Sequence, residues 1–381
     1  MKYNLKYLQI LFLVFFINIS FGTEHTIPFE LIHNNIILHS KLNGVDCKLM
    51  YDTGARSFLL NKEFATKNAI TAAKAFKGKL KGSFGNASME IKYVLLEDLD
   101  LIAGDLYDGI IGIDFFKDFI VKIDYENKVL SLSNSFEATA DYTKIPTNHL
   151  LRNPTFLYWF TANVEVQLSN GKTIQGNFLI DTGSGRSVSL TNKVSRELLK
   201  DKSLKKVQTK GAKSSFIGFK NPTYLKVPSL KIGDFSVTDY VVDCNTDIHK
   251  ETTKVIDGVL GSKFLKNFVI VIDFKTSSIY FKRNTTSNQP ITNSFYSDGF
   301  QLKDHRKSGK GILISSIIQS DMFEYPVKIG DQILEIDGEP ASTIDFNQLE
   351  KKKGKLNSEI LYKIKRKRKV FSVTTKVKDV F

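Results

Sequence analysis

Two stretches of the sequence decide the fold: Leu49-Met50-Tyr51-Asp52-Thr53-Gly54-Ala55 and Phe178-Leu179-Ile180-Asp181-Thr182-Gly183-Ser184. Each has apolar residues followed by Asp-Thr-Gly and one small residue. A hairpin signal precedes each stretch, at Asn43-Gly44 and at Asn170-Gly171, and alternating strand-like residues flank both signals. The two regions therefore share a motif and the strand pattern around it.

The similarity continues downstream of both stretches. Asp108-Gly109-Ile110-Ile111-Gly112 matches Asp257-Gly258-Val259-Leu260-Gly261, and each is followed by a short helical turn and a strand that contains Ile-Asp. Because four features recur in the same order, we infer a duplicated β-rich unit, from about 27 to 135 and from about 156 to 284. This predicts a mainly β fold with two lobes related by a pseudo-twofold axis.

Each Asp-Thr-Gly places a carboxylate at the end of a buried strand, where burial alone raises its pKa. The Thr hydroxyl can fix the loop by a hydrogen bond, and Gly lets the backbone approach another segment closely. One such tripeptide is weak evidence, since it often forms an ordinary turn or a helix N-cap. Two copies in a duplicated unit would bring Asp52 and Asp181 side by side.

Two adjacent carboxylates can hydrolyse an amide without a metal or a covalent intermediate. They cannot both ionise easily, so the pair holds one proton over a wide pH range. One carboxylate can deprotonate a shared water while the other protonates the carbonyl oxygen of the substrate. We therefore expect Asp52 and Asp181 to act without a cofactor or a metal.

At these residues the sequence resembles the retropepsin-like aspartic proteases, over roughly residues 27 to 284. The match rests on both Asp-Thr-Gly motifs and on the two hydrophobic-hydrophobic-Gly elements, Ile110-Ile111-Gly112 and Val259-Leu260-Gly261. The resemblance implies two β-barrel lobes in one chain, a bilobal arrangement like that of pepsin, with Asp52 and Asp181 as the catalytic dyad. It also implies that the dyad loops are supported by Thr53, Gly54, Ala55, Thr182, Gly183 and Ser184.

The two dyad loops are not equivalent. The loop from Asp181 to Ser187 is one residue longer than the loop from Asp52 to Ser57. The residue after Asp-Thr-Gly also differs: in the family, Ala accompanies activity nearer neutral pH and Ser accompanies acidic activity. The pH optimum therefore stays open.

The family covers its substrate with a Gly-containing hairpin, the flap, and each lobe offers one candidate. These are residues 77–89, with Phe84, and residues 210–224, with Phe216. Both aromatic residues are candidates for contact with substrate, and simple packing in the core is the competing interpretation.

The pattern changes near Phe295. The run Ile329-Gly330-Asp331-Gln332-Ile333-Leu334-Glu335-Ile336-Asp337-Gly338 resembles the bacterial type of PDZ domain. In that family an extended peptide adds as a strand beside a Gly-apolar loop, and its terminal carboxylate meets backbone N–H groups. The resemblance places this loop at Gly311, Ile312 and Leu313. The alternative is a PDZ-like packing module that binds no peptide.

The N-terminus predicts export. Residues 1–22 combine basic residues, an apolar run from Leu8 to Ile19 and a small-residue site, which is the pattern of a secretory signal peptide. A membrane anchor is the alternative, but the run is shorter than the ~20 residues that span a bilayer. We therefore expect a periplasmic or secreted protein, in which Cys47 and Cys244 either pair or remain buried thiols.

Composition excludes several classes of protein. With 42% hydrophobic and 25% charged residues and 2 Cys, the chain is not disordered, collagen-like or disulfide-framed. The net charge of +14 suggests a nucleic-acid or anionic-surface partner, but its densest run, Lys363 to Lys369, falls in a predicted hairpin turn where the charges can be solvated. The 6 His show no metal-ligand spacing.

We therefore predict an exported aspartic endopeptidase that acts on extended peptides or proteins and whose PDZ domain binds peptide C-termini. It should be a monomer, since one chain carries both halves of the dyad, with no nucleic-acid partner and no stable membrane span. The rival hypothesis is a non-catalytic peptide-binding adaptor on the same fold. The predicted parts are a signal peptide at 1–22, protease lobes at 23–150 and 151–290, and a PDZ domain at 291–381.

Overall fold

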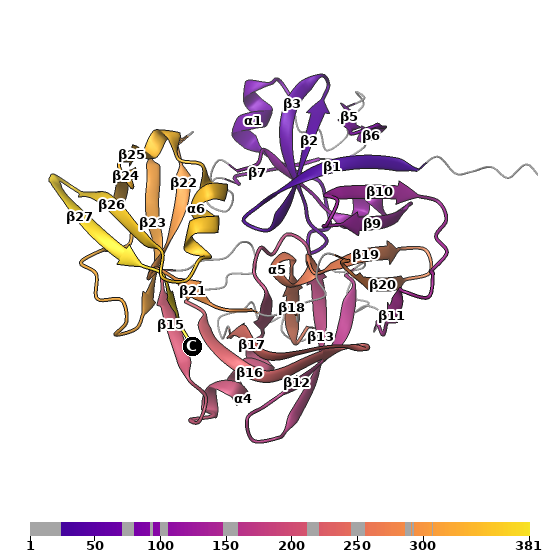
Figure 1. Ribbon diagram of the computed structural model, residues 1–381. Helices are drawn as coiled ribbons and strands as arrows, with labels where there is room; N and C mark the ends of the chain where they lie inside the picture. The colour runs from indigo at the N-terminus through magenta and orange to yellow at the C-terminus, as the bar shows by residue number, and fades with distance from the viewer. Residues whose placement is uncertain are drawn as a thin grey trace, which may run out of the picture.

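The computed structural model describes residues 24–70, 80–91, 94–99, 106–147, 159–211, 221–244, 256–285, 291, 293–306 and 308–381. Within these ranges the protein is mainly β, with two β lobes and a smaller C-terminal β unit (Figure 1). The predicted signal peptide, residues 1–22, lies outside them. In the part of the chain that is described, no helix has the length and apolarity needed to cross a membrane.

The first lobe is built from hairpins whose turns the sequence specifies. His33 and Asn34 have φ of 51° and 68°, and Asn43 and Gly44 have φ of 48° and 86°; positive φ at both positions is what a two-residue type I′ turn requires. The lobe contains β1 (His25–Ile32), β2 (Asn35–Leu42), β3 (Val45–Tyr51), β4 (Leu59–Asn61), α1 (Lys62–Lys67), β5 (Leu80–Phe84), β6 (Ala87–Ile91), β7 (Leu95–Glu97), β8 (Gly109–Ile111), α3 (Ile113–Phe116), β9 (Ile120–Asp124) and β10 (Val129–Ser133).

The second lobe contains β11 (Thr143–Ile145), β12 (Thr161–Gln167), β13 (Thr173–Asp181), β14 (Val188–Leu190), α4 (Asn192–Lys200), β15 (Lys206–Lys210), β16 (Thr223–Ile232), β17 (Phe235–Cys244), β18 (Gly258–Gly261), α5 (Ser262–Leu265), β19 (Phe268–Asp273) and β20 (Ser278–Arg283). Its pairings repeat those of the first lobe. β13 pairs in parallel with β18, as β3 does with β8. β14 pairs antiparallel with β18, as β4 does with β8.

The two lobes share a sheet through the antiparallel pair β9 and β19 (Figure 1). Val121 lies opposite Ile272, and Ile123 lies opposite Ile270. In the sequence repeat, Val121 corresponds to Ile270 and Ile123 to Ile272, so exchanging the lobes leaves the pairing unchanged. All four side chains are fully buried. The joint between the lobes is therefore apolar and symmetric.

The C-terminal unit has its own hydrophobic core and contains a buried carboxylate. Asp298 is fully buried, accepts a 2.7 Å hydrogen bond from the Tyr362 hydroxyl and lies 2.9 Å from the Lys353 ammonium.

The C-terminal unit contains β21 (Tyr296–Ser297), β22 (Phe300–His305), β23 (Gly311–Gln319), β24 (Gln332–Ile336), β25 (Glu339–Pro340), η2 (Ala341–Thr343), α6 (Phe346–Lys353), β26 (Glu359–Arg366), β27 (Lys369–Lys376) and β28 (Lys378–Asp379).

The C-terminal unit is joined to the second lobe by a strand pair. β23 pairs antiparallel with β15, with Thr209 opposite Ile318, so the two units share one sheet (Figure 1). Beside this pair the Tyr224 ring stacks on Phe295, with ring centroids 4.3 Å apart. The joint positions α6 next to the lobes.

The two cysteines are free and buried. The Sγ of Cys47 donates a weak hydrogen bond to the carbonyl oxygen of Ser40, at 3.5 Å. Burial raises the pKa of both thiols, Cys47 and Cys244, to about 12. They are therefore neutral core residues and not nucleophiles.

Candidate active site

Each Asp-Thr-Gly loop begins where a parallel strand pair ends. β3 delivers Asp52, whose backbone N–H donates to the carbonyl oxygen of Ile111 at the end of β8, at 2.9 Å. The repeated Asp-Gly of the sequence has a role in this pair: the Asp108 carboxylate accepts from the N–H of Lys48 at 2.8 Å. In the second lobe the Asp257 carboxylate accepts from the N–H of Asn177 at 3.0 Å. The carboxylates of this repeated element therefore hold strands and do not face the dyad.

The two loops are tied together by their threonines. The N–H of Thr53 donates to Oγ1 of Thr182, and the N–H of Thr182 donates to Oγ1 of Thr53, both at 3.0 Å. Each hydroxyl then donates across the interface, from Thr53 to the carbonyl of Ile180 at 2.7 Å and from Thr182 to that of Tyr51 at 2.9 Å. Four buried hydrogen bonds thus fix the position of one loop against the other.

The glycines permit the two carboxylates to approach the opposite loop. A Cβ added to Gly54 would lie 2.6 Å from Cγ of Asp181, and one added to Gly183 would lie 2.1 Å from Cγ of Asp52. Both distances are far inside van der Waals contact. Each carboxylate therefore packs on the glycine of the other lobe, and the sequence needs glycine at both positions.

Both carboxylates accept hydrogen bonds from their own loop. Oδ1 of Asp52 accepts from the N–H groups of Gly54 and Ala55, at 2.7 and 3.1 Å. Oδ1 of Asp181 accepts from those of Gly183 and Ser184, at 2.9 and 3.0 Å. These bonds hold one oxygen of each group in the loop, so the other oxygens are left for the partner carboxyl and for a ligand.

The environment favours one proton shared by the pair. Burial raises the pKa of Asp52 above its ordinary value, and hydrogen bonds that this group accepts oppose the rise. Burial and the negative charge of Asp52 raise the pKa of Asp181 much further. The pair therefore favours holding one proton between its two carboxyls, and burial together with the charge of Asp52 favours Asp181 as the protonated group.

The extra residue of the second loop is Gly185. The N–H of Ser262 donates to the carbonyl of Ser184, and that of Lys263 to the carbonyl of Arg186, so the chain bulges between these two bonds. The bulge contacts the β1–β2 turn: the Asn34 side-chain amide donates to the carbonyl of Gly185 at 3.2 Å. The inserted residue thus links the second dyad loop to the first lobe.

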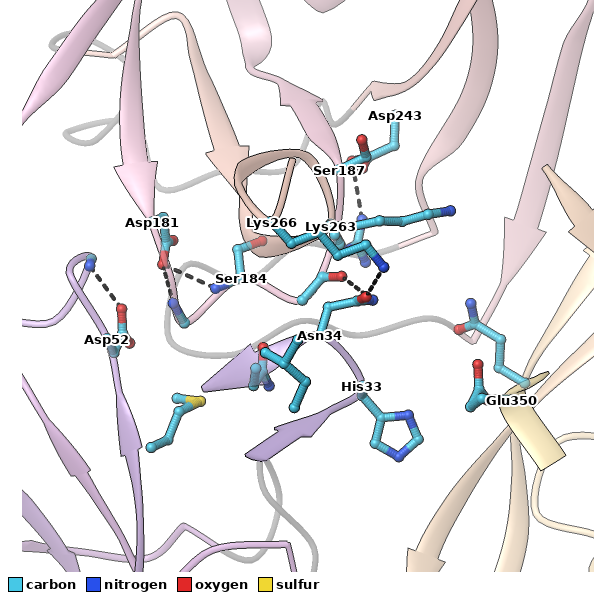
Figure 2. A pocket seen from close by; sticks show the side chains of 18 of the residues that line it. His33, Asn34, Asp52, Asp181, Ser184, Ser187, Asp243, Lys263, Lys266 and Glu350 are labelled. Atoms are coloured by element: carbon cyan, nitrogen blue, oxygen red, sulfur yellow. Dashed lines mark hydrogen bonds and ion pairs between the residues drawn. The ribbon is translucent and has the colours of Figure 1, made fainter. Parts of the chain in front are cut away.

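The dyad lies in a cleft of about 2060 Å³ that extends to the C-terminal unit. Its walls include both dyad loops, the turn at His33 and Asn34, and Glu350 of α6 (Figure 2). Leu302 of β22 also lines the cleft. The described residues hold no cluster of three or more His, Cys, Asp or Glu that could ligate a metal ion. The cleft presents the carboxylate pair to a ligand, together with polar side chains and with apolar ones such as Met50 and Leu302.

The flap candidates have different outcomes. Phe84 is fully buried and packs against Phe115 and Phe116, with ring centroids 5.2 and 6.3 Å apart, so its interpretation as a substrate-facing aromatic was wrong. Phe216 and most of its hairpin, residues 212–220, lie outside the described residues, as do residues 77–79.

The structure also adds residues that sequence reasoning missed. Trp159 lines the cleft, and its indole N–H donates to the carbonyl of Gly54 at 2.9 Å. The only sequence feature that could have pointed to Trp159 is that it is the single Trp of the chain. The contact of Asn34 with the second loop had no signal, because it joins a turn to a bulge far away in sequence.

The expected peptide site at Gly311, Ile312 and Leu313 needs correction. All three residues pair with β22, and Ile312 and Leu313 also pair with β24, so this strand has no free edge there to accept a peptide strand. β22 instead pairs with a single strand among the described residues, and it begins after Gly299, whose φ is 102°. The Gly299-Phe300 step is the Gly-apolar element at the start of this edge strand. Phe300 lines the cleft, and its carbonyl oxygen accepts a 2.8 Å hydrogen bond from Lys353 of α6.

Comparison with known families matches residues 291–361 to the PDZ domain family. A comparison with curated proteins gave no match. The match supports a peptide-binding or protein-interaction role for this unit. The C-terminal part of the chain, residues 291–361, is a PDZ domain.

Proposed function

We propose that the protein is an aspartic endopeptidase of the retropepsin-like type, with its two lobes in one chain. The observation that carries the proposal is the reciprocal packing at the dyad. Asp52 and Asp181 each lie against the glycine of the opposite loop, and Thr53 and Thr182 hold those loops together. A protein that only binds peptides has no need for two buried, interacting carboxylates.

The reaction follows from the protonation of the pair. A water held between the carboxyls loses a proton to Asp52 as its oxygen attacks the carbonyl carbon of the scissile amide. Asp181 gives its proton to the carbonyl oxygen, which yields a neutral tetrahedral diol. The diol collapses when the amide nitrogen receives the proton held by Asp52 and a hydroxyl proton returns to Asp181. The products are an amine and a carboxylic acid, and the dyad regains its starting state.

The PDZ domain would hold substrate at the same cleft. Leu302 of β22 and Glu350 of α6 line the cleft that contains the dyad. We infer that a peptide added to the open edge of β22 points along this cleft, since β-strand addition fixes the direction of a bound chain. Substrate capture and cleavage would then occur on one surface.

The proposal is tested by hydrolysis of an unfolded protein mixture in water enriched in oxygen-18. The wild-type chain should produce new peptide termini that carry one heavy oxygen, and pepstatin should inhibit this turnover. The Asp52→Asn variant should bind the same mixture without cleaving it. Binding without cleavage by the wild-type chain would instead favour a non-catalytic adaptor.

We also propose that the protein is exported, on the signal-like pattern of residues 1–22. Expression of the full chain, cell fractionation and N-terminal sequencing test this. Export predicts a mature chain that begins near residue 23 outside the cytoplasm, whereas a chain that keeps residues 1–22 in the cytoplasm would contradict it.

A further inference from the structure

The two lobes differ in charge at equivalent positions next to the dyad loops. In the first lobe the N–H of Asp114 donates to the carbonyl of Arg56 at 3.0 Å, and in the second the N–H of Lys263 donates to that of Arg186, also at 3.0 Å. These matching backbone bonds make Arg56 equivalent to Arg186 and Asp114 equivalent to Lys263. The first lobe therefore has an anion where the second has a cation.

The reversal changes the pairing of the arginines. Arg56 forms an ion pair with Asp114 at 3.1 Å. Arg186 has no anion at the equivalent position and pairs instead with Asp243 at 3.0 Å. The second oxygen of Asp243 accepts from the Ser189 hydroxyl at 2.8 Å, and the group is 3% exposed. Asp243 therefore interacts with Arg186 and Ser189.

Lys263 forms no ion pair with any residue that the structure describes, although it is partly buried and lines the cleft (Figure 2). The neighbouring Lys266 ammonium donates to Oδ1 of Asn34 at 2.9 Å. Glu350, on α6, acts on Lys263 electrostatically without forming an ion pair with it. Burial and the charge of Lys266 lower the pKa of Lys263, which is the expected cost of a desolvated ammonium without a counter-ion.

A carboxylate that enters the cleft would remove this cost. The site lies between the second dyad loop and the PDZ helix, where an extended substrate would run. A charge-assisted hydrogen bond to a partly desolvated ammonium is stronger than a neutral one. In the first lobe the equivalent position is already neutralised by the pair of Arg56 and Asp114, so the preference would act on one side of the dyad only.

We propose that Lys263 binds a carboxylate of the peptide substrate and so sets the specificity of the cleft on the side of the second lobe. This rests on the proposed peptidase function. The carboxylate is either an Asp or Glu side chain at a fixed distance from the scissile bond or the C-terminus of the chain.

The test is a synthetic peptide library in two forms, one with free and one with amidated C-termini, in which the Asp and Glu side chains stay free in both. The full chain is incubated with each form, and cleavage sites are identified by mass spectrometry. An acidic side chain as ligand predicts about tenfold enrichment of Asp or Glu at one position in both forms. A terminal carboxylate as ligand predicts cleavage at a fixed distance from the C-terminus in the free form only.

Four variants isolate the lysine. Lys263→Met should abolish the preference, and Lys263→Arg should keep it because the charge remains. Glu350→Gln should strengthen it, since a competing anion is removed. Lys231→Met is the matched control, because Lys231 is exposed on β16 away from the cleft and should change nothing.

The inference and the proposed function fail in different ways. The role of Lys263 is overturned, and the peptidase function is not, by either of two results. The first is that the chain cleaves peptides with no preference for a carboxylate, and the second is that Lys263→Met cleaves them with the same preference as the wild type. If the wild-type chain cleaves nothing, the peptidase function is overturned. In that case, the peptides bound by the immobilised wild-type chain are compared with those bound by the immobilised Lys263→Met variant. The role of Lys263 is supported only if the wild-type chain binds acidic peptides that the variant does not bind.

Discussion

Thr53 and Thr182 each accept a hydrogen bond from the backbone N–H of the other, at the same distance of 3.0 Å. The Thr53 hydroxyl also donates to the carbonyl of Ile180, and the Thr182 hydroxyl donates to the carbonyl of Tyr51. Each of these carbonyls lies on the strand that leads into the loop of the other lobe. All of these bonds cross between the lobes. The relative position of Asp52 and Asp181 therefore depends on a network that neither lobe forms by itself.

Removing one hydroxyl should loosen this network. Thr53→Val leaves the buried N–H of Thr182 without an acceptor, which should lower the free energy of unfolding by about 1–3 kcal/mol. Thr53→Ser keeps the hydroxyl and is the control. Urea denaturation of both variants measures the effect, and equal stability of Thr53→Val and the wild type would show that the network does not hold the lobes.

A methyl group at Gly183 should displace the dyad. Its Cβ would lie 2.1 Å from Cγ of Asp52, so the loop or the carboxylate must move. Since misplacement of reacting groups by about 1 Å costs about a hundredfold in rate, Gly183→Ala should lose that much kcat/KM. Gly354→Ala, whose Cβ has its nearest neighbour at 3.3 Å, is the control. Wild-type turnover in Gly183→Ala would count against the dyad geometry.

The raised pKa of Asp181 predicts the direction of a pH effect on stability. The folded state binds this proton more tightly than the unfolded state, in which the pKa is near the ordinary 3.8. The stabilisation that comes from protonated Asp181 is therefore fully present at pH values below this unfolded-state pKa, and it is lost as the pH rises towards the folded-state pKa. Asp181→Asn should remove this loss, so its stability advantage over the wild type should grow with pH. Unfolding curves across the pH range check this, and a constant difference would contradict it.

The two arginine pairs predict unequal costs. Arg186→Met removes the guanidinium that pairs with the carboxylate of Asp243, which is 3% exposed, and should cost about 3–5 kcal/mol. Arg56→Met breaks a more exposed pair with Asp114 and should cost about 0–1 kcal/mol. Thermal or urea unfolding of both variants provides the comparison. Similar small losses in both would mean that Asp243 is solvated.

The sequence was informative where chemistry is local. The repeated Asp-Thr-Gly located strand ends that lie together, and the Asn-Gly signals located turns with positive φ at Asn43 and Gly44. The run at Ile329 to Gly338 identified the PDZ domain, which the family comparison confirms. Short turns and buried strands have strong local sequence signatures, so these features could be read directly.

Features that depend on distant contacts could not be read in the same way. Gly311 and Gly299 both precede apolar residues, and only the sheet order shows that the strand after Gly311 is interior. Phe84 has the surroundings of a flap aromatic in sequence but packs in the core. The role of Gly185 depends on a contact with Asn34, from another lobe.

The most direct test of the central claim is the kcat/KM of Asp52→Asn, Asp181→Asn and the double variant on one peptide substrate, with circular dichroism to confirm the fold. If the two carboxyls act as one unit, each single variant should lose nearly as much activity as the double variant. A folded single variant that cleaves as fast as the wild type would contradict the account.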